Sequence, residues 1–159
     1  MRPRTFPGKE KLKIQGSYRF PASREAVWEL LNDPARLAKC LPGCERLEPI
    51  GPDRYRVAVK YAIAAIGGNF SGTIELLDKK PPHSLRLRSE SKGTPGFVKG
   101  EGALELAEKD GQTELRYSGE VQVGGLIASV GQRMLDMASR RITQQFFESA
   151  AAQLKAAKS

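Results

Sequence analysis

The side chains best suited to covalent or metal chemistry in this 159-residue sequence are two cysteines and one histidine. Cys40 and Cys44 lie close together in the segment CLPGC, and His83 lies in the turn PPHS. A structural zinc site needs about four ligands, which this set does not supply. Spacing alone leaves open a disulfide across the Pro42–Gly43 turn. We favour two small, partly buried thiols in a reducing cytoplasm.

Other catalytic arrangements are not evident in the sequence. Neither thiol has a histidine base nearby, and no pair of carboxylates falls on the predicted inner faces of the strands. The glycine-rich stretch GTPGFVKGEG lacks the strand-to-helix context that phosphate-binding loops require. We therefore expect a protein that is not an enzyme and has no tightly required cofactor.

The elements that would position these residues follow from hydrophobic periodicity. Residues 12–20 alternate between apolar and polar side chains and predict a half-buried strand. Ser23 and Asp33 are the predicted N-caps of two short helices that come next. Further strands, separated by turns rich in Gly, Pro and Asp, are predicted at 44–50, 54–65, 69–79, 84–92, 97–108 and 112–123. Charged residues at alternate positions indicate an antiparallel sheet with one solvated and one dry face.

A single long helix is predicted from about Leu126 to Lys155, because this stretch contains no proline and carries an apolar stripe. The stripe consists of Val130, Met134, Ala138, Ile142, Phe146, Ala150 and Leu154, with Ile127, Gly131 and Leu135 beside it. We expect it to cover the dry face of the sheet. The predicted fold class is therefore α+β, with one domain at 11–155 and flexible ends at 1–10 and 156–159.

Small residues recur on the predicted inner face of the sheet, where large apolar side chains would be usual. They are Gly16, Gly72, Ser89, Ser91, Gly100, Gly102 and Gly119. Sheet curvature is one explanation for glycine in strands. The other is space for a guest, because native interiors do not tolerate large empty voids cheaply. We interpret this pattern as a container for an apolar molecule.

The residues expected to contact this guest come from the inner strand faces, the helix stripe and the turns at the mouth. They are Tyr18, Leu41, Tyr61, Phe70, Phe97, Tyr117, Ile127, Met134, Leu135 and Ala138. A few hydroxyls on this face would orient the guest through one or two hydrogen bonds. Phe97 is the predicted gate, where the turns at 41–43, 66–68 and 95–97 converge. An ordinary packing role is the alternative for each of these residues.

The charge of the chain, +8 with 26 Lys and Arg against 18 Asp and Glu, narrows the choice of partners. Basic clusters in the N-terminal tail and the last helix suit an anionic membrane surface or an acidic protein, unless they only solvate the surface. We expect no nucleic acid, because aromatic and basic residues do not interleave on one strand face. No stretch has the length of a membrane span, and no apolar segment of a signal peptide follows the basic start. A cytoplasmic location is therefore expected.

Several segments of the chain resemble the CoxG family of carbon monoxide dehydrogenase subunits, which belongs to the START-like, helix-grip superfamily (SRPBCC). The most specific of them are LPGCE, PGFVKGEG and the VGG…GQR junction into the last helix. The resemblance covers roughly Leu12 to Phe147. It implies a seven-stranded, curved antiparallel sheet around a long C-terminal helix, two short helices after the first strand, and a hydrophobic cavity.

The resemblance also implies an accessory role beside molybdenum-containing CO dehydrogenases and related hydroxylases, in membrane recruitment and in carrying lipophilic quinones. Some family members continue into a proline-rich linker and an apolar anchor, whereas this sequence ends at AAAQLKAAKS. We therefore expect any contact with the inner membrane face to be peripheral. The predicted function is binding of a lipophilic molecule, with a quinone as the leading candidate, for such a molybdenum enzyme. The alternatives are an assembly or docking module with an incidental cavity, and a cavity enzyme of the cyclase or hydrolase type.

Overall fold

A computed structural model describes residues 9–63 and 66–158 of the chain. The first half contains β1 (Lys9–Phe20), α1 (Arg24–Leu31), α2 (Pro34–Cys40), β2 (Cys44–Gly51), β3 (Arg54–Ile63) and β4 (Ile66–Lys80). The second half contains β5 (Ser84–Gly93), β6 (Gly96–Lys109), β7 (Gln112–Gly124), the 3-10 helix η1 (Leu126–Val130) and α3 (Gln132–Lys158).

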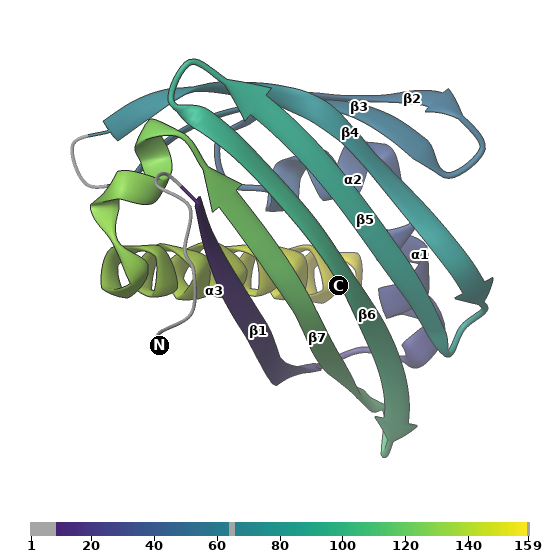
Figure 1. Cartoon of the computed structure of the whole chain (residues 1–159). Coiled ribbons are helices and arrows are strands. Elements are labelled where there is room, and N and C mark those ends of the chain that lie inside the picture. Colours follow the sequence, from purple (N-terminus) through teal and green to yellow (C-terminus); the bar gives the residue numbers. More distant parts are fainter. Residues whose placement is uncertain (1–8, 64–65, 159) are drawn as a thin grey trace.

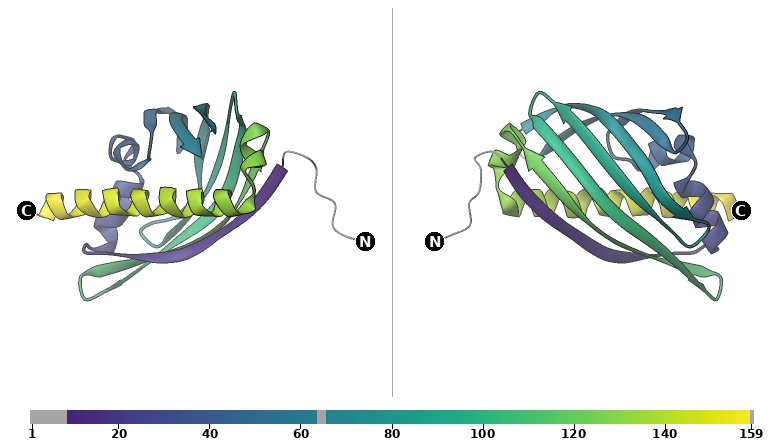
Figure 2. Two further views of the ribbon diagram at one scale, coloured as in Figure 1. Left: turned by 90° about the vertical axis from the view of Figure 1, so that its left-hand side faces the viewer. Right: turned by 45° about the vertical axis from the view of Figure 1, so that its right-hand side comes forward.

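Seven strands form one antiparallel sheet in the order β1-β7-β6-β5-β4-β3-β2. From β2 to β7 each strand pairs with the next one in the chain, while β1 pairs with β7. The sheet curves around α3, and α1 and α2 pack beside the C-terminal half of that helix (Figure 1, Figure 2). This arrangement confirms the predicted helix-grip fold. None of the helices in the described part of the chain has the length and hydropathy needed to cross a bilayer.

The two short helices begin at the predicted caps. The Ser23 side chain accepts a hydrogen bond from the Ala26 amide at 3.2 Å. The Asp33 carboxylate accepts from the amides of Ala35 and Arg36 at 3.0 and 3.4 Å. Each cap satisfies amides that the first turn of a helix leaves without intrahelical partners.

The prediction of one continuous helix from Leu126 was wrong. Gly131 has a left-handed backbone, with φ of +94°, and it separates η1 from α3. A glycine at such a position ends one helix and lets the chain change direction before the next. The described elements also reach slightly beyond the predicted domain limits, since β1 begins at Lys9 and α3 continues to Lys158. Residues 1–8 of the predicted tail at 1–10, and Ser159 of the predicted flexible end at 156–159, lie outside the described residues.

Three clusters of buried apolar side chains form the core. The first surrounds Phe20, Leu115 and Phe147, where α1 and α2 pack on α3. The second lies under η1 and contains Leu12, Phe70, Val123, Ile127, Ala128 and Leu135. The third, around Tyr55, Leu76 and Leu85, covers part of the sheet wall. The concave face of the sheet is therefore packed at both ends of α3.

Candidate ligand-binding cavity

A cavity of about 360 Å³ lies on the concave face of the sheet, beneath α3. From the helices and the turn after α2 it is lined by Leu31, Leu37, Leu41, Ile142, Thr143, Phe146 and Phe147. From the strands its apolar lining includes Ile14, Leu47, Tyr55, Ile74, Leu76, Leu85, Leu87, Leu104, Leu115, Tyr117 and Val121. A cavity of this volume and lining is suited to an apolar small molecule.

Glycines contribute to the wall of this cavity for two different reasons. Gly102 and Gly119 face each other across β6 and β7. A Cβ built at Gly119 would lie 2.5 Å from the Glu101 carbonyl oxygen, and one built at Gly102 would lie 2.9 Å from the Ser118 carbonyl oxygen. Close approach of neighbouring backbones therefore requires glycine at both positions, which favours the explanation from sheet curvature.

Gly100 differs from this pair, because there is room for a side chain beside it. A Cβ at Gly100 would lie 3.4 Å from Ser89 Oγ and 3.7 Å from Val121 Cγ2, which are ordinary contact distances. Both Gly100 and Ser89 line the cavity. At these two small residues the sheet borders unfilled space, as the sequence pattern predicted.

The remaining small residues of the predicted inner face do not line the cavity. The Tyr117 ring lies over Gly16, and the backbone at Glu90 lies against Gly72. The Ser91 hydroxyl donates a hydrogen bond to the Val98 carbonyl at 3.5 Å. Their small size therefore allows neighbouring side chains and strands to pack closely.

The structure brings two of the ten predicted contact residues, Leu41 and Tyr117, to the cavity wall. Tyr18 instead stacks on Phe147 in the first core cluster, with ring centroids 5.0 Å apart. Phe70, Ile127 and Leu135 fill the second cluster. These residues pack in the core because the chain breaks at Gly131, so that η1 lies against the sheet and closes this end of the concave face. Met134, Ala138, Tyr61 and Phe97 also lie outside the lining of the cavity.

The predicted gate, Phe97, lies on the opposite face of the sheet. Side chains alternate along β6, and Val98 packs in the core, so Phe97 points outward with Lys99. Its ring lies against Gly124, and Lys99 Nζ is 5.6 Å from the ring centroid. Phe97 is therefore not positioned to control entry to the cavity.

Two of the three turns predicted at the mouth lie over the closed end. Pro95 contacts Gly68, and its carbonyl accepts a hydrogen bond from the Ile127 amide at 2.7 Å. Ile66 and Val98 pack against the second core cluster beneath them. These turns therefore cover packed core.

The third turn, at 41–43, borders a groove of about 780 Å³ between α2, the end of β3 and α3. The groove is lined by Lys39, Cys40, Leu41, Pro42, Gly43, Lys60, Tyr61, Ala62, Gln145, Glu148, Ser149 and Ala152. Leu41 is the residue that lines both the groove and the cavity. The backbone beside it is fixed, since the Lys60 amide donates to the Gly43 carbonyl at 2.8 Å. The half-buried Leu41 side chain thus separates the two spaces.

Sequence reasoning missed most of the lining on β5, β6 and α3. Leu87, Leu104, Ile142 and Phe146 line the cavity, yet none was named as a contact. The alternation and the helix stripe placed all four on inner faces. Leu104 and Phe146 also pack against the first core cluster, so they lie where the packed core meets the cavity. That position is a property of the assembled fold.

The two cysteines are free thiols. Cys40 is buried and accepts a hydrogen bond from Gln153 Nε2 at 3.1 Å, and burial raises the pKa of its thiol. Cys44 donates to the Arg46 carbonyl at 3.4 Å, and burial raises its pKa as well. Raised pKa values keep both sulfurs protonated near neutral pH, unlike a nucleophilic cysteine. Among residues 9–63 and 66–158, no group of three or more His, Cys, Asp and Glu side chains could hold a metal ion.

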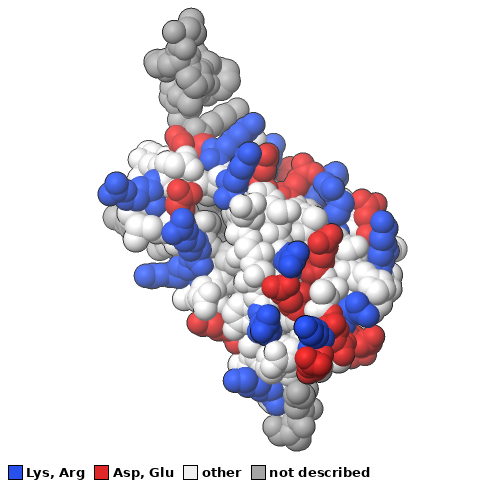
Figure 3. Space-filling view, turned by 90° about the horizontal axis from the view of Figure 1, so that it is seen from below, with Lys and Arg blue, Asp and Glu red and all other residues white. Residues whose placement is uncertain are grey.

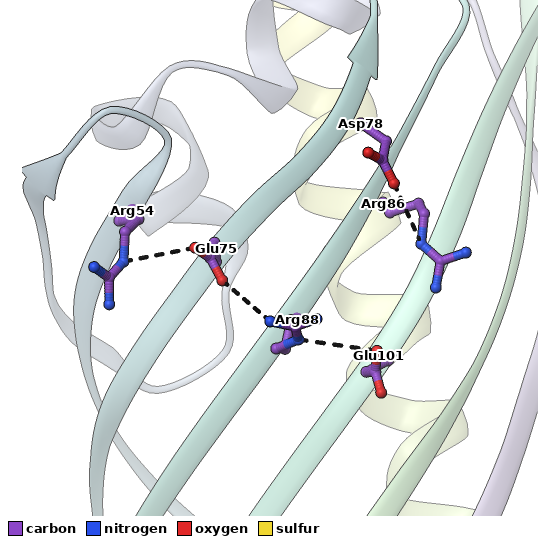
Figure 4. Close-up of polar contacts among 6 residues, drawn as sticks. All are labelled: Arg54, Glu75, Asp78, Arg86, Arg88 and Glu101. Atoms are coloured by element: carbon purple, nitrogen blue, oxygen red, sulfur yellow. Dashed lines mark ion pairs between the residues drawn. The ribbon is translucent and has the colours of Figure 1, made fainter.

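Ion pairs cross the outer face of the sheet, away from the cavity (Figure 4). Glu75 lies between Arg54, at 3.8 Å, and Arg88, at 3.6 Å, and Arg88 also approaches Glu101 at 3.9 Å. Such partly exposed pairs each contribute little to stability. The surface viewed from below likewise shows acidic and basic side chains interspersed (Figure 3).

The sheet, the enclosed helix and the apolar cavity define a START-like helix-grip protein. A START superfamily protein from Mycobacterium smegmatis has a TM-score of 0.68 at 13% identity, covering 90% of this chain and 97% of that one. The Zhui aromatase/cyclase from Streptomyces sp. R1128 has a TM-score of 0.68 at 16% identity, covering 92% and 94%. At such identities the likeness shows the fold alone.

Within this class, the chain belongs to the CoxG family of carbon monoxide dehydrogenase subunits, whose profile matches residues 16–155. A conserved protein from Geobacillus kaustophilus is 37% identical, with a TM-score of 0.87, and the alignment covers 91% of this chain and 95% of that one. No curated protein sequence matches the chain significantly.

Proposed function

We propose that the protein binds a lipophilic small molecule in the cavity, with a quinone as the leading candidate, and has no catalytic activity of its own. The observation that carries this proposal is the apolar space of about 360 Å³ between two packed ends of the core. A globular interior rarely leaves such a space without a use. A chain longer than the cavity would extend past Leu41 into the groove.

A binding role agrees with the chemistry of the walls. The carboxylates nearest the cavity, Glu101 and Glu120, are exposed and lie on the outer phase of their strands. Cys40 is held protonated, and His83 is exposed in the turn between β4 and β5 and does not line the cavity. The inner-facing polar groups are hydroxyls, which orient a ligand more readily than they activate one.

The family assignment supports the second part of the proposal, that the protein serves a molybdenum-containing enzyme of the CO dehydrogenase type. Delivery of a lipophile to such an enzyme would require contact with the membrane that supplies it. Met137 is 58% exposed on α3, one helical turn from Arg133, Arg140 and Arg141, which are exposed as well. An exposed apolar residue among arginines suits peripheral contact with the anionic inner membrane face.

Solvent extraction of the purified protein, followed by mass spectrometry, tests the proposal. We expect an isoprenoid or acyl species in near-equimolar amount, and its mass would identify the ligand class. A blank extract, together with no uptake of added quinones, would contradict the proposal. That result would favour a docking module in which the cavity is incidental.

A further inference from the structure

Hydroxyl groups are the polar side-chain groups on the inner face of the cavity wall, and they differ in what they lie beside. Thr143 Oγ1 donates to the Ser139 carbonyl within α3 at 2.8 Å. The Tyr117 hydroxyl lies over Gly16, where an added Cβ would be 2.6 Å from it. Tyr55 lies beside the ion pair of Asp53 and Lys79, and burial, with the Asp53 charge, raises the pKa of its phenol.

Ser89 is the hydroxyl of this wall that lies beside Gly100, where there is room for a side chain. It lies on the inner phase of β5, between Leu87 and Ser91, and is paired with Gly100 on β6. Its Oγ is 3.4 Å from the point where Gly100 would carry a Cβ, so the hydroxyl borders the space left by that glycine. No hydrogen bond from this hydroxyl is seen within the described part of the chain, and Ser89 lines the cavity. The hydroxyl is therefore free to donate to an acceptor on a ligand placed there.

We propose that Ser89 is the specificity-determining contact of the cavity: its hydroxyl donates a hydrogen bond to a carbonyl oxygen of the ligand and holds the polar head beside Gly100. This inference rests on the proposed function and narrows it. The ligand class becomes a lipophile whose carbonyl-bearing ring lies against β5 and β6. The apolar remainder of the ligand extends toward Leu41 and the groove.

A matched pair of ligands distinguishes the contribution of this hydrogen bond to affinity from that of apolar burial. Menadione and 2-methylnaphthalene share one fused-ring skeleton and differ by the two carbonyl oxygens. Binding of both to the parent protein, Ser89→Ala and Ser71→Ala is measured by equilibrium dialysis. Ser71 is an exposed serine on the outer phase of β4 and serves as the matched control.

We expect Ser89→Ala to weaken menadione binding about 5- to 10-fold, the effect of one hydrogen bond, and to leave 2-methylnaphthalene binding unchanged. Ser71→Ala should bind both ligands like the parent. If the parent and Ser89→Ala preferred menadione over 2-methylnaphthalene by the same factor, the inference would be overturned, while the proposed function would stand. Loss of the preference in Tyr117→Phe or Thr143→Val, with Ser89→Ala unaffected, would also overturn it. Failure of the parent protein to bind either ligand would overturn the inference and the proposed function together.

Discussion

At Gly119 the neighbouring strand comes so close that a side chain would meet the Glu101 carbonyl, whereas a Cβ at Gly100 on the adjacent strand would make only ordinary van der Waals contacts. The two positions look alike in the sequence, and the structure assigns them different roles. We predict that Gly119→Leu lowers the free energy of unfolding by about 1–3 kcal/mol, or the Tm by roughly 2–12 °C. Gly100→Leu should cost clearly less, because its side chain enters the cavity. Thermal unfolding followed by circular dichroism measures both.

The control for this comparison is Ser71→Leu, which adds a leucine to the outer face of the sheet. Equal losses of stability in the Gly100 and Gly119 variants would show that the close approach of neighbouring strands requires glycine at position 100 as well. The cavity would then be smaller than the structure indicates.

The cysteines give a second prediction at the scale of single residues. Burial raises the pKa of both thiols, so the reactive thiolate is scarce at neutral pH and increases only as the pH rises through the raised pKa. We expect iodoacetamide to modify half-buried Cys44 slowly at pH 7 and faster above pH 9, with buried Cys40 reacting mainly after unfolding. Peptide mass spectrometry distinguishes the two sites. Rapid modification of Cys40 in the folded protein at pH 7 would mark it as an activated thiol.

At the scale of elements, the turn between α2 and β2 borders both the groove and the cavity through Leu41. Its backbone is tied to β3 through Gly43 and Lys60, so movement of the Leu41 side chain is the simplest way to open the passage. We predict that Leu41→Ala accelerates exchange of a fluorescent lipophile more than it changes affinity. Stopped-flow fluorescence measures the exchange rate.

Phe97→Ala provides the control, since Phe97 lies on the outer face of the sheet. We expect its exchange rate to match that of the parent protein. If Phe97→Ala accelerated exchange and Leu41→Ala left the exchange rate unchanged, the entrance would lie at the opposite end of the cavity.

The elements themselves were largely predictable, because each has a local cause. Alternation predicted every strand within a few residues, and Ser23 and Asp33 marked the starts of α1 and α2. The break before α3 was not predicted, because Gly131 in an apolar stripe resembles an ordinary small residue. Its left-handed backbone depends on how the chain leaves β7.

The cavity wall was less predictable than the elements that form it. Phase along a strand or helix shows which side faces inward, but not which inward residues are covered by core packing. Leu135 and Ile142 lie on the same stripe of α3, yet Leu135 packs under η1 and Ile142 lines the cavity. That difference depends on where the helix meets the curved sheet.

At the scale of the whole molecule, the proposed peripheral membrane contact involves the exposed basic residues on α3. Reversing Arg140 and Arg141 to Glu should weaken sedimentation with anionic liposomes, because each such charge contributes about 1 kcal/mol near the membrane. The effect should diminish at high salt. The double variant Lys80→Glu and Lys109→Glu is the control, because it changes the net charge by the same amount. These lysines are the last residues of β4 and β6, at strand ends far from η1 (Figure 1). Equal losses in both double variants would indicate a response to net charge alone.

The central claim, that the cavity holds a lipophile, is tested most directly by titrating the protein with a short-chain quinone while following Trp28 fluorescence. Trp28 is the one tryptophan of the chain and packs against the core cluster of Tyr55, Leu76 and Leu85, all of which line the cavity. We predict saturable quenching at one equivalent in the parent protein and in Ser71→Leu, and its loss in folded Gly100→Leu, whose side chain occupies the space. Quenching that never saturates in the parent protein, or that is unchanged in Gly100→Leu, would contradict the account.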